Sequence, residues 1–372
     1  MKNIAFALTS FLFLLIISSC SKTQSGDDPL TAVRKNAILV STENNSLISY
    51  DATTGAKLWE KALKGSATGS PTIYKEKVYS VSDNGTFTVI ELATGKTLIE
   101  ITTLPPSSNA TYIYNDRIYI AGNNLYCYDL IGNFKWVFKR GFNFKTAPTI
   151  KNDFLYATGS DTCYKIKMMP DTAWAVWVYP TPTNAVIQGS PTVVNGIVYF
   201  GADDKKIYAV YDANAALKWS YTTNDVVLSS PMAYGGMCIA GSNDYYIYGV
   251  DSTTGQPRWK IPTKERVFSS PCIHEFSNTI FIGSYDFNLY AIDHVSGTIK
   301  WKYPAGSLIK SSPVVFGDHV FFTSFDKYLY CVNVYTGLTV WKSYMNANSQ
   351  SSPIVDDLNS GVYSGISGNS KY

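Results

Sequence analysis

The chain has 372 residues, of which 45% are hydrophobic, 15% aromatic and only 16% charged. This composition supplies enough apolar side chains for a sizeable core and excludes a chain that stays disordered. The formal net charge of +3, from 31 basic and 28 acidic residues, excludes the strongly basic surface that nucleic-acid binding requires. The abundance of Tyr, Phe, Gly and Pro favours strands and turns over helices.

The first 20 residues have the pattern of an export signal. Lys2 supplies positive charge, and the apolar run over residues 4–17 is too short for a comfortable transmembrane helix. Ser18-Ser19-Cys20 ends this run, and small residues directly before a Cys resemble the lipobox of bacterial lipoproteins. That resemblance implies cleavage before Cys20 and a lipid on Cys20. An ordinary signal peptide with an incidental Cys is the alternative.

Three segments are therefore expected. Residues 1–19 form a lipoprotein signal peptide, residues 20–30 a flexible polar tether, and residues 31–372 a single domain. We expect a lipid-anchored protein of the bacterial cell envelope. Outer-membrane sorting is favoured by analogy, because Lys22 rather than Asp follows Ser21.

A repeat of about 40 residues runs through the rest of the chain. A dipeptide of a small residue and Pro recurs, and its Pro residues are Pro71, Pro148, Pro191, Pro231, Pro271, Pro313 and Pro353. The matching Trp residues are Trp59, Trp136, Trp177, Trp219, Trp259, Trp301 and Trp341. The first interval in each series is 77 residues, which is two steps across one degenerate unit where Leu98 replaces Trp. Two markers thus share one period over eight units.

Each unit predicts four short strands separated by tight turns. Apolar runs such as 191–194 and 197–200 follow Ser-Pro, and a third run has the form of Leu289-Tyr-Ala-Ile-Asp293. A Thr-Gly or Ser-Gly turn comes next, and Trp stands four residues after its Gly. The middle of the third run holds only small residues, namely Cys127, Ala209, Gly249, Ala291 and Cys331. A bulky group must pack closely against that position.

These units predict an all-β chain that forms an eight-bladed β-propeller of four-stranded antiparallel blades. The Trp side chains are expected to dock between neighbouring blades. Runs at 31–33 and 38–40 resemble opening strands of the first unit, and runs at 353–355 and 361–364 resemble those of a ninth. We expect a shared blade in which C-terminal strands pair beside N-terminal ones and close the ring.

The repeat motif resembles that of the quinoprotein-type, or PQQ-like, propeller family. It stands as Asp51-Ala-Thr-Thr-Gly55-Ala-Lys-Leu-Trp59 and as Asp251-Ser-Thr-Thr-Gly255-Gln-Pro-Arg-Trp259, and the resemblance covers about residues 31–366. The family includes pyrroloquinoline quinone dehydrogenases and non-catalytic lipoproteins similar to the outer-membrane assembly factor BamB. The resemblance is specific for the fold and weak for the function.

The residues argue against the dehydrogenase reading. Such enzymes are much longer and carry two adjacent Cys, whereas no two Cys are adjacent here. The Asp residues that could bind calcium fall mostly in turns and are interpreted as turn formers: Asp83, Asp161, Asp204, Asp244, Asp286 and Asp326. The five Cys of the mature chain lie in strand-like runs and are interpreted as buried fillers: Cys127, Cys163, Cys238, Cys272 and Cys331.

Two hypotheses from different classes remain. The first is a monomeric, lipid-anchored propeller, neither an enzyme nor a cofactor carrier, that binds another envelope protein and acts in outer-membrane protein assembly, as the resemblance to BamB-like lipoproteins implies. The second is a PQQ-dependent redox enzyme, or a sugar- or small-molecule-binding sensor, on the same fold. Chain length, the lipobox and the missing catalytic pattern favour the first.

The segment before each Ser-Pro is the candidate partner-binding surface. Loops that lead into the innermost strands crowd around the central channel on one face. Three residues before each Pro the side chain varies freely, as Thr68, Lys145, Gln188, Leu228, Phe268, Lys310 and Gln350. Variation inside a rigid repeat predicts a position available for recognition. Arg266 beside Phe268 adds a residue type favoured at interface hot spots. A solvated loop without a partner is the alternative.

Overall fold

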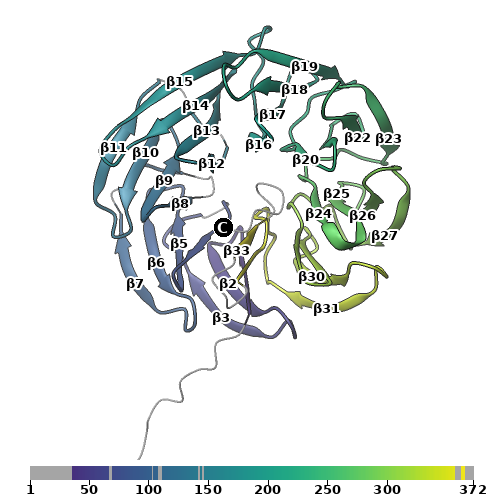
Figure 1. Ribbon diagram of the computed structural model, residues 1–372. Helices are drawn as coiled ribbons and strands as arrows, with labels where there is room; N and C mark the ends of the chain where they lie inside the picture. Colours follow the sequence, from purple (N-terminus) through teal and green to yellow (C-terminus); the bar gives the residue numbers. More distant parts are fainter. Residues whose placement is uncertain are drawn as a thin grey trace, which may run out of the picture. The chain divides into compact units, whose positions relative to one another are not determined.

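The computed structural model describes residues 36–66, 69–102, 104–107, 111–140, 143–144 and 146–356, and the backbone of 362–364. The chain divides into the units Met1–Val33 and Arg34–Tyr372, and all described residues belong to the second. Their strands form eight antiparallel sheets that follow one another around a centre (Figure 1). The predicted eight-bladed propeller is confirmed.

Seven blades are formed by four consecutive strands, running from the centre outwards. Blade 2 contains β4 (Thr72–Tyr74), β5 (Lys77–Val81), β6 (Phe87–Glu91) and β7 (Thr97–Ile101). Blade 3 contains β8 (Tyr112–Tyr114), β9 (Arg117–Ala121), β10 (Leu125–Asp129) and β11 (Phe134–Phe138). Blade 4 contains β12 (Thr149–Lys151), β13 (Phe154–Gly159), β14 (Thr162–Met168) and β15 (Ala173–Pro180). Blade 5 contains β16 (Thr192–Val194), β17 (Ile197–Ala202), β18 (Lys206–Tyr211) and β19 (Leu217–Thr222). Blade 6 contains β20 (Met232–Tyr234), β21 (Met237–Gly241), β22 (Tyr246–Asp251) and β23 (Pro257–Pro262). Blade 7 contains β24 (Cys272–His274), β25 (Thr279–Gly283), β26 (Asn288–Asp293) and β27 (Ile299–Pro304), with the 3-10 turn η1 (Glu275–Ser277) between β24 and β25. Blade 8 contains β28 (Val314–Phe316), β29 (His319–Thr323), β30 (Tyr328–Asn333) and β31 (Thr339–Tyr344).

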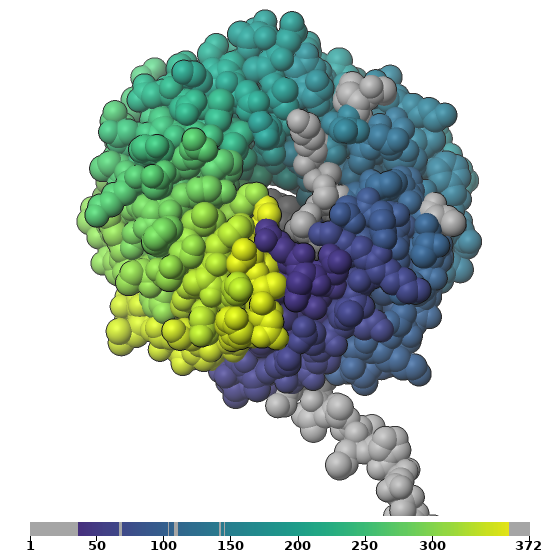
Figure 2. Space-filling model, turned by 180° about the vertical axis from the view of Figure 1, so that it is seen from behind, coloured from purple at the N-terminus to yellow at the C-terminus, as the bar shows by residue number. Residues whose placement is uncertain are grey.

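Blade 1 joins the two ends of the described chain. Its strands are β1 (Ala37–Ser41), β2 (Ser46–Asp51), β3 (Lys57–Ala62), β32 (Ile354–Asp356) and β33 (Val362–Ser364), in the order β3-β2-β1-β32-β33. β32 takes the place of the first strand, which β4 and β16 occupy in their own blades, and pairs antiparallel with β1 on one side and with β33 on the other. The N-terminal and C-terminal segments accordingly lie side by side in both views (Figures 1 and 2). The predicted shared blade is present, with β33 as a fifth strand, while the run at 31–33 lies outside the described residues.

The burial of the strands follows their place in the blade. The second and third strands, such as β17 and β2, are buried on both faces because a neighbouring blade covers each face. The outermost strands, such as β27, alternate between half-buried and exposed residues, since the blades diverge towards the rim. The core is thus a series of apolar layers between adjacent blades.

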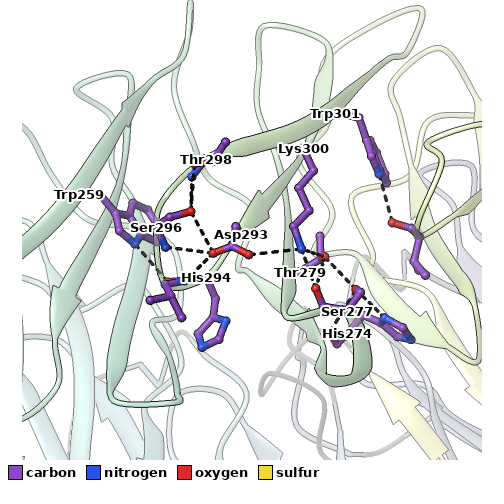
Figure 3. Close-up of polar contacts among 12 residues, drawn as sticks. Trp259, His274, Ser277, Thr279, Asp293, His294, Ser296, Thr298, Lys300 and Trp301 are labelled. Atoms are coloured by element: carbon purple, nitrogen blue, oxygen red, sulfur yellow. Dashed lines mark hydrogen bonds and ion pairs between the residues drawn. The ribbon is translucent and has the colours of Figure 1, made fainter.

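Each of the seven Trp residues of the repeat docks on the next blade, and Figure 3 shows two of the contacts. The Nε1–H of Trp259 donates to the carbonyl oxygen of His294 at 3.2 Å, and that of Trp301 donates to the carbonyl of Val334 at 3.1 Å. The same bond closes the ring, because the Nε1–H of Trp341 donates to the carbonyl of Ala52 at 3.2 Å. Trp59, Trp136, Trp177 and Trp219 also donate to a backbone carbonyl of the following blade. The predicted docking role holds for all seven.

The five small residues predicted in the middle of a third strand each lie directly opposite a Trp, whereas blade 4 has Lys165 opposite Trp177 and blade 2 has Val89 opposite Ile99. Ala209 pairs with Trp219, Gly249 with Trp259, and Cys331 with Trp341. A Cβ at Gly249 would lie only 2.2 Å from Cε2 of Trp259. The predicted bulky neighbour is therefore the indole of the same blade.

The assignment of Leu98 to the missing Trp position is wrong. Val89 pairs with Ile99, and the ladder then shifts by one residue, as it does after Trp59 pairs with Ser49. Ile99 packs against the core between blades 2 and 3, whereas Leu98 is exposed at the rim. Ile99 also stands four residues after Gly95, the Gly-to-Trp spacing of the other units.

A candidate protein-binding face

Two faces of the propeller differ in the connections they carry. On the face named here the N-terminal face, turns join the first strand to the second and the third to the fourth, and β1 begins there at Ala37, opposite Asp51 and Asp356. On the opposite face, named the loop face, lie the turns between second and third strands and the loops between blades. The described members of the predicted partner-binding set belong to the loop face, namely Gln188, Arg266, Phe268, Lys310 and Gln350.

Asp side chains fix each loop to the turn beside it. Oδ2 of Asp286, between β25 and β26, accepts the backbone N–H of Lys264 at 3.0 Å and the hydroxyl of Tyr290 at 2.5 Å. Burial of this carboxyl alone would raise its pKa, but the donated hydrogen bonds outweigh burial and lower it. Asp244 and Asp326 make the equivalent bonds to Asn224 and Gly306. The interpretation of these Asp residues as structural turn formers is confirmed.

Ser residues before the Pro link neighbouring loops. The backbone N–H of Ser190 donates to Oγ of Ser230 at 2.8 Å, and Ser230 donates in the same way to Ser270 at 2.9 Å. Ser270 and Ser312 continue the series as far as Ser352. The loops that carry Leu228, Phe268 and Lys310 are therefore each hydrogen-bonded to the loop on either side.

The variable position holds an aromatic side chain where the chain enters blade 7. The Phe268 ring stacks on Tyr285 with ring centroids 4.6 Å apart, and Arg266 is exposed beside it. Tyr285 also donates its backbone N–H to the carbonyl of Arg266 at 2.9 Å. Phe268 is half-buried, so the ring is less exposed than the sequence predicted.

Polar residues occupy the same position in other loops of this face. Nε2 of Gln188 donates to both carboxylate oxygens of Asp203, at 3.0 and 2.9 Å. Nζ of Lys310 donates to the side-chain carbonyl of Gln350, whose amide nitrogen donates to Glu43. Lys310 and Gln350 thus lie together and form a polar chain from blade 8 to blade 1. Thr68, Lys145 and Cys20 lie outside the described residues.

The five described Cys residues carry unreactive thiols. All five are buried and unpaired. Burial raises the pKa of Cys127 and Cys331 to about 12, and it raises the pKa values of Cys163, Cys238 and Cys272 as well. Their interpretation as apolar fillers is confirmed. Within the described part of the chain, His, Cys, Asp and Glu residues form no group of three or more that could hold a metal ion.

A family model places this propeller among known proteins. The model described as "Outer membrane protein assembly factor BamB" matches residues 18–99 and 144–343, which is well over half of the chain. The chain belongs to the BamB family. The unmatched interval contains all of blade 3, whose third-to-fourth turn reads Leu130-Ile-Gly132 instead of the Thr-Thr-Gly of blade 1. A comparison with curated proteins finds no match.

Solved structures share the fold of this BamB-family chain at low sequence identity. BamB from Moraxella catarrhalis superposes with a TM-score of 0.66 and 15% identity, over 80% of this chain and 93% of that one. The computationally designed Ika8 protein gives 0.68 and 14%, over 83% and 97%. The dihydro-heme d1 dehydrogenase NirN in complex with DHE gives 0.70 and 13%, over 88% and 76%. At these identities the likeness establishes the fold alone.

Sequence reasoning missed a group of exposed apolar side chains on the N-terminal face of blades 7 and 8, of which Phe276 is the most exposed. A signal for it exists in the sequence, since Pro271 and Pro313 are 42 residues apart rather than 40. The two extra residues lie between β24 and β25.

In the described part of the chain, no helix has the length and apolar character needed to cross a membrane.

Proposed function

We propose that this BamB-family chain is a non-catalytic, lipid-anchored binding protein of the bacterial cell envelope. Its loop face holds another envelope protein, and its role lies in outer-membrane protein assembly. The observation that carries this proposal is the loop face itself, where hydrogen-bonded loops present side chains of different chemistry at one repeated position: Gln188, Leu228, Phe268, Lys310 and Gln350.

The titratable groups support a binding role. The shifted carboxyls, such as Asp286 and Asp251, hold backbone N–H groups or an Arg, and the raised Tyr pKa values have burial as their first cause. These shifts are explained by structural hydrogen bonds and burial rather than by a paired acid and base in one cleft. The family description and the M. catarrhalis protein support the assembly context.

The first prediction concerns partner capture on the loop face. Changing Arg266 and Phe268 together to Ala should weaken capture of the envelope partner by about 1–3 kcal/mol, because Arg and aromatic side chains dominate interface energies. The measurement is quantitative pull-down from detergent-solubilised envelopes, with melting curves to establish that the fold is intact. Arg258→Ala, which removes an exposed Arg from β23 away from this face, is the matched control.

Two results would contradict this placement. If capture survives the double change and also Lys145→Ala with Lys310→Ala, the partner binds elsewhere on the ring. Saturable binding of pyrroloquinoline quinone with calcium, accompanied by dye-linked oxidation of a sugar or alcohol, would favour the enzymatic alternative instead.

The second prediction concerns anchorage. Cys20→Ser should release the protein into the soluble fraction or leave residues 1–19 uncleaved, since no lipid can be attached to Ser. Fractionation of cells and mass spectrometry of the N-terminus measure both outcomes. Ser19→Ala keeps a small residue before Cys20 and should behave like the parent. Unchanged processing and membrane association of the Cys20→Ser protein would refute the lipobox.

A further inference from the structure

Blade 7 carries an insertion on the N-terminal face. Between β24 and β25 the chain runs through Glu275, Phe276, Ser277 and Asn278. The corresponding turns of the other blades from 2 to 8 have two residues each, namely Lys75–Glu76, Asn115–Asp116, Asn152–Asp153, Asn195–Gly196, Gly235–Gly236 and Gly317–Asp318. The insertion places Phe276 at its tip with 94% of its surface exposed. Exposure of a whole aromatic side chain is unfavourable unless something covers it.

Hydrogen bonds beneath Phe276 hold the insertion in place (Figure 3). Nδ1 of His274 lies 2.7 Å from Oγ of Ser277, which also donates to Oγ1 of Thr279 at 2.8 Å. Nζ of Lys300 donates to the carbonyl of Ser277 at 2.6 Å and lies 3.4 Å from the carboxylate of Asp293. These polar contacts therefore hold in place the backbone of the turn that carries the exposed Phe276 ring.

Other exposed apolar side chains lie on the same face of blades 7 and 8. Val295 is 64% exposed in the turn between β26 and β27. Tyr335 and Leu338 are 53% and 68% exposed in the turn between β30 and β31. The His274 ring lies edge-on to Tyr335, with centroids 5.5 Å apart, and 6.0 Å from Phe276, so it connects the two aromatic residues. Phe276, Val295, Tyr335 and Leu338 are named the apolar patch below.

The patch lies on the face where the chain enters the propeller. β1 begins at Ala37 on the N-terminal face of blade 1, and blade 8 adjoins that blade through Trp341 and Ala52. The covalent chain between Cys20 and Asn36 can span at most about 55 Å. A lipid on Cys20 would therefore tether the propeller through the same face that carries the patch.

We infer that the apolar patch docks on a lipid surface, with Phe276 as its inserting residue. The inference rests on the lipid anchorage proposed above, because that anchor is what brings the patch close to a membrane in the cell. A second apolar contact strengthens membrane binding beyond what a tether provides, because the tether raises the local concentration of the patch at the bilayer. The four patch residues carry no charge. The charged groups around them are Glu275 beside Phe276, Asp318 beside Tyr335, and Lys300, which is engaged by Ser277 and Asp293. No free cation therefore stands beside the patch among these groups, and the contact depends on apolar burial rather than on anionic headgroups. The loop face then points away from the membrane and stays open to a protein partner.

The test uses the mature full chain with Cys20→Ser, which carries no lipid. Phe276→Cys in this background is labelled with an environment-sensitive dye, a selective reaction because the five remaining Cys are buried. Vesicles of phosphatidylethanolamine and phosphatidylglycerol should raise the dye emission and shift it to the blue, with little change between 0.1 and 0.5 M salt. The same dye at Ala93→Cys, an exposed turn residue of blade 2 on this face, or at Lys205→Cys on the loop face should respond weakly.

Co-sedimentation of the unlabelled protein provides the second readout. Phe276→Ser should reduce the bound fraction at a fixed lipid concentration about tenfold with an unchanged melting curve, since the side chain is exposed. Equal dye responses at positions 276, 93 and 205, or equal sedimentation of parent and Phe276→Ser, would overturn the inference. Loss of partner capture in Phe276→Ser without vesicle binding would assign the patch to a protein instead. Because no lipid is attached to this chain, failure of the anchorage proposal would appear only in the Cys20→Ser fractionation.

Discussion

Removal of residues 350–372 is expected to destabilise the propeller by at least about 5 kcal/mol. The deletion takes away β32, whose Ile354 and Val355 are buried against blades 2 and 8 and are each worth about 1.5–3 kcal/mol. It also takes away the Ser351 hydroxyl that accepts the backbone N–H of Ser41 at 3.0 Å. The inner edge of β1 and the apolar layers on both sides would then meet water. Chemical denaturation and thermal melting measure the effect.

A shorter truncation separates ring closure from mere chain length. Removing residues 365–372 leaves β32 and β33 intact, so we expect a stability close to that of the full chain. If the proteins lacking residues 350–372 and 365–372 both have the melting temperature of the full chain, the C-terminal strands do not close the ring. A loss of stability in the longer deletion alone would show that β32 carries the closure.

Gly297→Ala is expected to cost about 2–4 kcal/mol, because it damages the Trp docking directly. Gly297 has φ +72°, and a Cβ there would lie 2.6 Å from Cγ of Trp259 in the preceding blade. Gly236→Ala is the matched control, since Gly236 has φ +80° but no atom within 4 Å of the added Cβ. That control isolates the backbone penalty, of about 1–2 kcal/mol. The difference between the two variants measures the contact with the indole.

A double-mutant cycle checks the same contact independently. Trp259→Ala alone should cost about 3 kcal/mol, since it removes a large part-buried indole and its bond to the His294 carbonyl. In the double variant the Cβ at position 297 no longer meets the indole, so the combined cost should fall well below the sum. Strict additivity would mean that Trp259 and Gly297 are not coupled across the blades.

The repeat allowed most of the fold to be predicted from the sequence. Strand order, blade number and the shared blade follow from turn residues and Trp spacing, because the same local pattern recurs often enough to define each element. Even the position opposite Trp, occupied by Gly249 or Ala209, could be recognised from its restriction to small residues. The error at Leu98 arose because blade 2 has no Trp to mark the register of its fourth strand. The spacing of four residues from Gly95 identifies Ile99 instead.

The surfaces could be predicted only in part. Sequence position identified the loops that carry Arg266 and Gln188, but the stacking of Phe268 on Tyr285 and the bond from Lys310 to Gln350 join different loops and need the three-dimensional structure. The patch was missed because Phe276 and Tyr335 belong to separate units and are brought together, through the His274 ring, only when blades 7 and 8 pack against each other. A repeat determines which face a residue lies on more readily than which residues lie together there.

The central claim is that the loop face of this BamB-family propeller binds another envelope protein. The most direct test is a photo-crosslinking amino acid placed at Phe268 in cells that produce the protein in its native envelope, with Lys260 on the outer strand β23 as the comparison position. The account predicts one dominant crosslinked protein from position 268, identifiable by mass spectrometry, and little or none from position 260. Equal crosslinking at both positions, or none at 268 while the propeller stays folded and membrane-associated, would contradict it.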